Sequence, residues 1–159
     1  QGRLDPVRAS PLLRRDAVAF VEGPTQQTLP RHRFEHPLQL VLLDGPHSYP
    51  FPDMEYYFLY PQLEAGGLLI LDDIHIPTIH NLFRFVREDE MFAPVGVLGK
   101  TAFFERSTAP GFPTLGGDDW QRQAFNSRRF PLALDSAGNV TSPFSRALRR
   151  ARRILRGLG

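Results

Sequence analysis

The sequence predicts an open α/β sheet, and three features of the 159-residue chain lead to this fold class. Short runs of aliphatic and β-branched residues have the character of buried parallel strands. A segment with helical spacing separates the second run from the third, which makes a strand-helix-strand unit. A turn signal between two further short runs predicts an antiparallel hairpin at the C-terminal edge of an otherwise mainly parallel sheet.

Composition limits the class of protein. A chain of this length with 42% hydrophobic residues can bury one ordinary core. The absence of cysteine excludes disulfides and zinc-thiolate sites. No run approaches the roughly 18 apolar residues of a membrane span, and no signal peptide is visible, so we expect a cytoplasmic protein.

The predicted strands are the apolar runs Val18 to Val21, Leu38 to Leu43 and Leu68 to Leu71. A helix between the last two is expected to begin at Pro52-Asp53 and to end near Gly66-Gly67. The side chains that share its apolar face are predicted to be Met54, Tyr57, Phe58 and Leu63.

A second helix and a hairpin complete the predicted sheet domain. The helix starts near Pro77, and its apolar positions are Ile79, Leu82, Phe83 and Val86. The segment "APVGVLGKTAFFERS" then predicts two short strands about a Gly99-Lys100 turn. We therefore divide the chain into a partial domain (1–106), an irregular extension rich in proline and glycine (107–141), and a C-terminal helix (142–159).

Acidic residues end two neighbouring predicted strands. Asp44 follows the second strand and Asp72-Asp73 follow the third, so the carboxylates should converge at the edge of the sheet where α/β proteins bind ligands. Three adjacent carboxylates repel one another unless a hard divalent cation neutralises them; magnesium is favoured, with manganese and calcium as alternatives. The simpler alternatives are that Asp73 only caps the next helix and that His47 is a solvated loop residue.

The stretch "LQLVLLDGPHSYPFPDMEYYFLYPQLEAGGLLILDDIH" resembles the second half of class I S-adenosylmethionine-dependent methyltransferases. Within that class it is similar to the metal-dependent O-methyltransferases of the macrocin group, through "DGPHSY", "AGG" and "LDD" in order. The resemblance covers roughly residues 16 to 106 and implies a Rossmann-like sheet that is incomplete at its N-terminus. It implies that Asp44, Asp72 and Asp73 hold Mg²⁺, that His47 is the general base, and that Tyr49 lines the site.

The cofactor half of such a site is only partly visible. The family's glycine-rich turn is absent, because the chain contains no G-x-G-x-x-G. The resemblance implies that Leu4-Asp5-Pro6 is the tail of a strand, that Asp5 grips the ribose of S-adenosylmethionine, and that the turn with Gly23, Thr25 and Gln26 contacts adenine. Asp5 as a solvated residue of a frayed terminus is an equal alternative. We also expect an upstream segment that carries the missing glycine-rich turn.

The C-terminal segment 142–159 is a predicted basic amphipathic helix. It contains six arginines and no acidic residue, so the net charge of +2 leaves the rest of the chain acidic. No specific nucleic-acid binding by the globular part follows from that charge. The helix could lie on an anionic membrane surface, bind an acidic partner or nucleic acid, or dock its apolar face on its own domain or on a second subunit. Docking or a partner is favoured over the membrane surface.

Two hypotheses of function follow. The first is an S-adenosylmethionine-dependent, Mg-assisted O-methyl transfer to a hydroxyl of a small metabolite or sugar. The second is a non-catalytic α/β module, a fragment or degenerate methyltransferase, that binds through its basic helix. Hydrolysis or oxidation at the same metal triad is kept as a third alternative, since related folds host other chemistry.

Overall fold

The computed structural model describes residues 5–111 and 123–127. The chain divides into two units, Gln1–Asn126 and Ser127–Gly159, and the sheet belongs to the first. Within the described ranges, no helix is both long enough and apolar enough to cross a membrane. The predicted C-terminal helix 142–159 lies outside the described residues, as does most of the extension 107–141.

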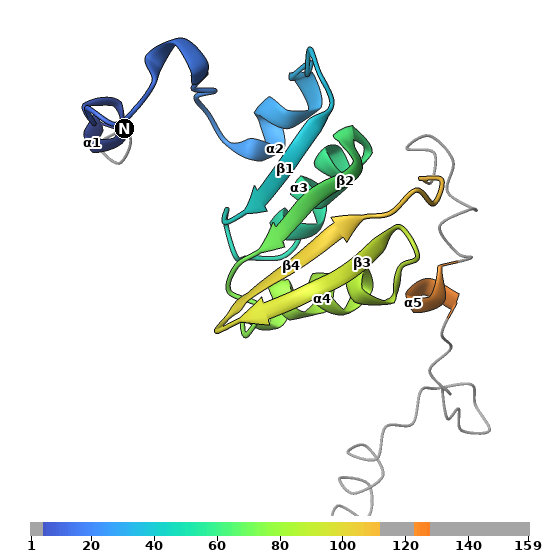
Figure 1. Cartoon of the computed structure of the whole chain (residues 1–159). Coiled ribbons are helices and arrows are strands. Elements are labelled where there is room, and N and C mark those ends of the chain that lie inside the picture. The colour runs from blue at the N-terminus through green and yellow to red at the C-terminus, as the bar shows by residue number, and fades with distance from the viewer. Residues whose placement is uncertain (1–4, 112–122, 128–159) are drawn as a thin grey trace, which may run out of the picture. The chain divides into compact units, whose positions relative to one another are not determined.

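Four strands form one sheet in the order β1-β2-β4-β3 (Figure 1). The strands are β1 (Leu38–Leu43), β2 (Leu63–Leu71), β3 (Phe92–Leu98) and β4 (Thr101–Arg106). β1 and β2 are parallel, whereas β4 is antiparallel to both β2 and β3. The α/β architecture and the hairpin about the Gly99-Lys100 turn are confirmed, but the described sheet is mixed rather than mainly parallel.

Two helices cover one face of this sheet. α3 (Phe51–Leu59) connects β1 to β2, and α4 (Pro77–Glu88) connects β2 to β3; both lie behind the sheet in Figure 1. The second helix is confirmed with its predicted start and with Ile79, Leu82 and Val86 buried. The core between the layers includes Val41, Leu43, Tyr56, Leu69, Leu71, Leu82, Val86 and Phe104.

The first helix is shorter than predicted. α3 ends at Leu59, and a 3₁₀ turn, η3 (Tyr60–Gln62), leads directly into β2. Pro61 has no backbone N–H to continue the α-helical bonding, which explains the early end. Gly66-Gly67 therefore lie inside β2, where a Cβ on Gly67 would come within 3.1 Å of the Gln39 carbonyl of the neighbouring strand.

The predicted strand Val18 to Val21 is wrong. Val18 has extended backbone angles, but the segment Val18 to Val21 pairs with no strand of the described residues. β1 is therefore the edge of the described sheet. A strand needs a neighbour to satisfy its backbone groups, so this segment stays irregular. A helical turn, α1 (Asp5–Arg8), stands where the tail of a strand was expected.

Short helical turns fill the rest of the N-terminal region and the described segment 123–127. They are η1 (Arg15–Ala17), α2 (Thr25–Thr28), η2 (Leu29–Arg31) and α5 (Ala124–Ser127). In the described part of the chain, the sheet face opposite α3 and α4 has Leu40 and Leu42 more than half exposed. β1 is thus apolar on both faces, but its described neighbours cover only the face toward α3 and α4.

A buried carboxylate joins the end of α4 to β3. Asp89 is 5% exposed, and it accepts hydrogen bonds from the Met91 backbone N–H and from Gln123 Nε2. Burial is the main influence on this group and raises its pKa above the ordinary aspartate value, although both hydrogen bonds oppose the change.

The core predicts a sharp difference between two leucines. Leu71→Ala should lower the free energy of unfolding by about 2–5 kcal/mol, because the side chain is fully buried between sheet and helices. Leu98→Ala is the matched control: that side chain is 77% exposed, and the change should stay within about 0.5 kcal/mol. Urea denaturation followed by circular dichroism measures both, and equal losses would contradict this account of the core.

The raised pKa of Asp89 leads us to expect a pH-dependent difference in stability between the parent chain and Asp89→Asn. Its folded pKa is raised, so the favourable contribution is present at acidic pH and is lost as the pH rises through the folded pKa. Asp89→Asn cannot ionise, so its melting temperature should exceed that of the parent chain at neutral pH. The gap should shrink as the pH falls toward 4; a gap that is constant with pH would contradict the prediction.

Candidate functional site

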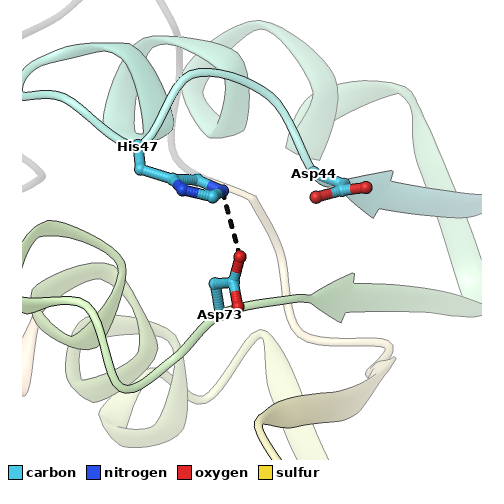
Figure 2. Close-up of side chains that lie close together, drawn as sticks. All are labelled: Asp44, His47 and Asp73. Carbon is cyan, nitrogen blue, oxygen red and sulfur yellow. Dashed lines mark ion pairs between the residues drawn. The ribbon is translucent and has the colours of Figure 1, made fainter.

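The parallel pairing of β1 and β2 brings two acidic loops together. Leu43 lies opposite Leu71, and the Asp72 backbone N–H donates to the Leu43 carbonyl at 3.2 Å, so both strands end at the same edge. Asp44 follows β1 and Asp73 follows β2, and Figure 2 shows their side chains near His47. Ligand atoms of Asp44, His47 and Asp73 all lie within 4.8 Å of one another.

His47 is held in this cluster by its backbone and by its ring. Its carbonyl accepts a hydrogen bond from the Thr78 hydroxyl in the first turn of α4. Its Nε2 lies 3.4 Å from Asp73 Oδ2, the contact drawn in Figure 2. The imidazole side chain is 36% exposed, so it is fixed in place yet open to a reactant.

Asp73 adopts an unusual backbone conformation. Its φ of 56° lies in the left-handed region, which aspartate tolerates better than most residues. Two backbone hydrogen bonds hold the turn: Ile74 N–H donates to the Lys100 carbonyl at 3.0 Å, and Ile76 N–H donates to the Asp73 carbonyl at 2.9 Å. A strained residue of this kind at a ligand-facing sheet edge is typical of functional sites.

Asp72 is turned away from the three-residue cluster. The Thr101 hydroxyl of β4 donates to Asp72 Oδ1 at 2.6 Å. This hydrogen bond is the main reason why the pKa of Asp72 is lowered, followed by a bond from the Asp73 backbone. The structure therefore brings together Asp44 and Asp73 with His47, and it places Asp72 beside that cluster rather than in it.

Lys100 is the site residue that the sequence did not indicate. Its Nζ donates to Asp73 Oδ1 at 2.5 Å and lies 3.9 Å from Asp72 Oδ2. The hydrogen bond to Asp73 raises the pKa of Lys100, and the charges of Asp72, Asp73 and Asp44 act in the same direction. His75 also lies near, with Nδ1 3.7 Å from Asp73 Oδ1. The hairpin signal predicted the turn that carries Lys100, but not its contact with the carboxylates.

A second acidic side chain connects the site to the predicted cofactor turn. Glu55 of α3 is 5% exposed, and it accepts a hydrogen bond from the Thr25 hydroxyl at 2.7 Å. A Cβ on Gly45 would lie only 2.5 Å from both carboxylate oxygens of Glu55. A side chain after Asp44 would therefore displace the Glu55 carboxylate, so Gly45 lets the loop pack closely against α3. No periodic pattern of the sequence indicates this buried glutamate.

The remaining predicted residues lie in separate places. Gly23 has a φ of 122°, a backbone conformation suited to glycine, and it precedes α2. Gln26 lines a shallow crevice with Phe51 and Phe58 of α3. Asp5 is in the separate turn α1, and Tyr49 is 78% exposed in the loop before α3. Thr25 is thus the predicted cofactor residue that the structure ties to the acidic edge.

Comparison with protein-family models found a methyltransferase domain over part of the chain. A family model described as a methyltransferase domain matches residues 6–74, which is less than half of the chain. The matched segment runs from α1 to the residue after Asp73 and includes all three acidic residues and His47. No curated protein matches the chain.

One similar solved structure is the MycE methyltransferase of the mycinamycin biosynthetic pathway, in complex with Mg and S-adenosylhomocysteine. Sequence identity is 20% and the TM-score is 0.33, with 56% of this chain and 30% of that chain covered. The chain thus spans less than a third of that enzyme's length.

The contact between Thr101 and Asp72 predicts a change in titration. Thr101→Val removes the donated O–H and should raise the pKa of Asp72 toward its ordinary value, because the ionised carboxylate loses its main stabilising contact. Carbon-13 NMR titration of the aspartate carboxyl signals, with a chelator present, measures this pKa. Thr78→Val is the control, since that hydroxyl bonds to the His47 carbonyl. An unchanged Asp72 pKa in Thr101→Val would refute the assignment.

Proposed function

We propose that this chain belongs to a metal-dependent O-methyltransferase similar to the macrocin group, which transfers a methyl group from S-adenosylmethionine to a hydroxyl of a small metabolite or sugar. The observation that carries the proposal is the convergence of Asp44, His47 and Asp73 at the carboxyl edge of two parallel strands. The match to a methyltransferase domain over those residues supports it.

The donor set fits a hard divalent cation. Two carboxylates and one imidazole offer atoms within 4.8 Å of one another, and oxygen-rich sets of this kind suit Mg²⁺ or Mn²⁺. Asp44 and Asp73 would hold the ion, and Asp72 would join them after a rotation away from Thr101. When bound, such an ion lowers the pKa of a nearby hydroxyl and offsets the charge on its oxygen.

His47 is the proton acceptor in this proposal. The unprotonated ring nitrogen of an imidazole can take a proton as a general base. As the acceptor O–H gives its proton to His47 Nε2, the oxygen attacks the sulfonium methyl group, the carbon–sulfur bond breaks, and S-adenosylhomocysteine leaves. Asp73 Oδ2, 3.4 Å from Nε2, would then stabilise the protonated ring.

The cofactor side of the proposal uses the Thr25 connection. Thr25 and Gln26 begin α2, and the Glu55 contact fixes this turn relative to Gly45 and the acidic loop. An adenosyl group held by the turn would therefore keep a constant distance from Asp44. Catalysis by methyl transfer depends on such positioning, because oxygen, carbon and sulfur must lie in line.

Metal binding is the first test of the proposal. Isothermal titration calorimetry of the full chain should show binding of Mg²⁺ or Mn²⁺, and Asp44→Asn and Asp73→Asn should each weaken it by at least about tenfold, the order seen even for outer-shell partners. Asp16→Asn is the control, because Asp16 is exposed and pairs with Arg14. Binding that is equal in all four proteins would refute the site.

His47 gives a second test that separates base from ligand. His47→Gln should lower the rate of methyl transfer to hydroxyl acceptors by about 10²–10⁴-fold while the Mg²⁺ affinity stays unchanged. His36→Gln is the control, because His36 lies in an exposed loop outside the cluster. A loss of Mg²⁺ binding in His47→Gln would instead make the imidazole a metal ligand. No S-adenosylmethionine binding with or without Mg²⁺ would remove the methyltransferase proposal.

A further inference from the structure

Lys100 is placed at the acidic edge by the backbone of the β3–β4 hairpin. β4 runs antiparallel to β2 with Ala102 opposite Leu71, so the residues before Ala102 lie beside those that follow β2. The Lys100 carbonyl accepts the Ile74 N–H at 3.0 Å, which fixes the turn without the lysine side chain. The Thr101–Asp72 hydrogen bond fixes it a second time.

The Lys100 ammonium group lies beside the carboxylates that would attract a metal ion. It hydrogen-bonds to Asp73 Oδ1 and lies 3.9 Å from Asp72 Oδ2. Asp73 is one of the residues whose ligand atoms gather in the three-residue cluster. Among the described residues, no other lysine or arginine forms an ion pair with Asp72 or Asp73.

The choice of lysine at this position is distinctive. Lys100 is the single lysine of the sequence, in which every other permanently basic side chain is arginine. Arginine would offer a planar fork that binds a carboxylate through two hydrogen bonds, whereas lysine is a compact charge on a flexible stem. The Lys100 side chain is 56% exposed while that of Asp73 is 13% exposed, so the ammonium can leave toward solvent and the carboxylate stays.

We propose that Lys100 is a tethered counter-ion that neutralises the acidic site when no divalent cation is bound and is displaced when one binds. This inference rests on the proposed function, because it assumes that Asp44 and Asp73 take a metal. Asp73 Oδ1 cannot serve the ammonium and a divalent cation at full strength, since the two positive charges repel one another at that distance. Lys100 therefore lowers the metal affinity of the site while it keeps the carboxylates gathered.

Two effects of Lys100→Met follow from this role. The variant should bind Mg²⁺ about fivefold or more tightly, because Mg²⁺ no longer has to displace the Lys100–Asp73 ion pair. It should also melt at a lower temperature than the parent chain in the presence of a chelator, because the carboxylates repel one another without a counter-ion. Saturating Mg²⁺ should remove that difference in melting temperature.

Calorimetric titration with MgCl₂ tests the competition in the full chain. Lys100→Met should show the tighter binding, and Lys100→Arg should bind more weakly than the parent chain because its fork holds Asp73 more firmly. Arg14→Met is the matched control: it also removes one positive charge, but from an exposed pair with Asp16, and its Mg²⁺ affinity should be unchanged. Lys100→Met that binds Mg²⁺ equally or more weakly than the parent chain overturns the proposal.

The single lysine allows a direct test in the unmutated chain. With lysine carbon-13 labelled at Cε, one lysine NMR signal reports Lys100, and Mg²⁺ should shift it toward the position of free lysine. This measurement decides the question even where a variant fails to fold. Calorimetric Mg²⁺ binding with an unmoved Lys100 signal overturns the displacement and leaves the metal site intact. No Mg²⁺ binding by any of the proteins overturns the metal site and, with it, the displacement.

Discussion

The parallel pairing of β1 with β2 is the constraint on which the candidate site depends. Leu43 and Leu71 are paired, are buried in the same core, and are the last residues of their strands. The observed register places Val41 and Leu43 of β1 in the core opposite Leu69 and Leu71 of β2, because alternate residues of a strand point to the same face. Asp44 and Asp73 thus face one another as a consequence of how the core packs.

Gathering these acids creates a repulsion that the surrounding elements have to offset. Thr101 donates to Asp72, His47 approaches Asp73 from the loop after β1, and Lys100 reaches both acids from the β3–β4 turn. Two of these partners, Lys100 and Thr101, come from the β3–β4 hairpin, and the third comes from the loop after β1. Because several contacts stabilise these carboxylates, a ligand can replace one contact while the others keep the side chains in place.

The buried Glu55 has a structural role with a functional consequence. Its carboxylate lies under Gly45 and accepts the Thr25 hydroxyl, so it joins the N-terminal turns to the loop that carries Asp44 and His47. The N-terminal turns otherwise have few regular elements to hold them, because β1 is the edge of the described sheet. The Glu55 side chain therefore helps to relate the adenine side of the proposed enzyme to its metal side.

The sequence by itself determined the strand-helix-strand unit, the helix from Pro77, the hairpin, and the acids at the strand ends, because apolar periodicity and turn residues are local signals. It failed at Val18 to Val21 and at Gly66-Gly67, where a pairing partner and the helix-breaking Pro61 decided the outcome. Only the tertiary structure decided that Asp72 turns to Thr101, that Glu55 supports Gly45, and that Lys100 contacts Asp73. These contacts join residues that are far apart in the chain, and no local pattern encodes which side chains meet when the elements pack.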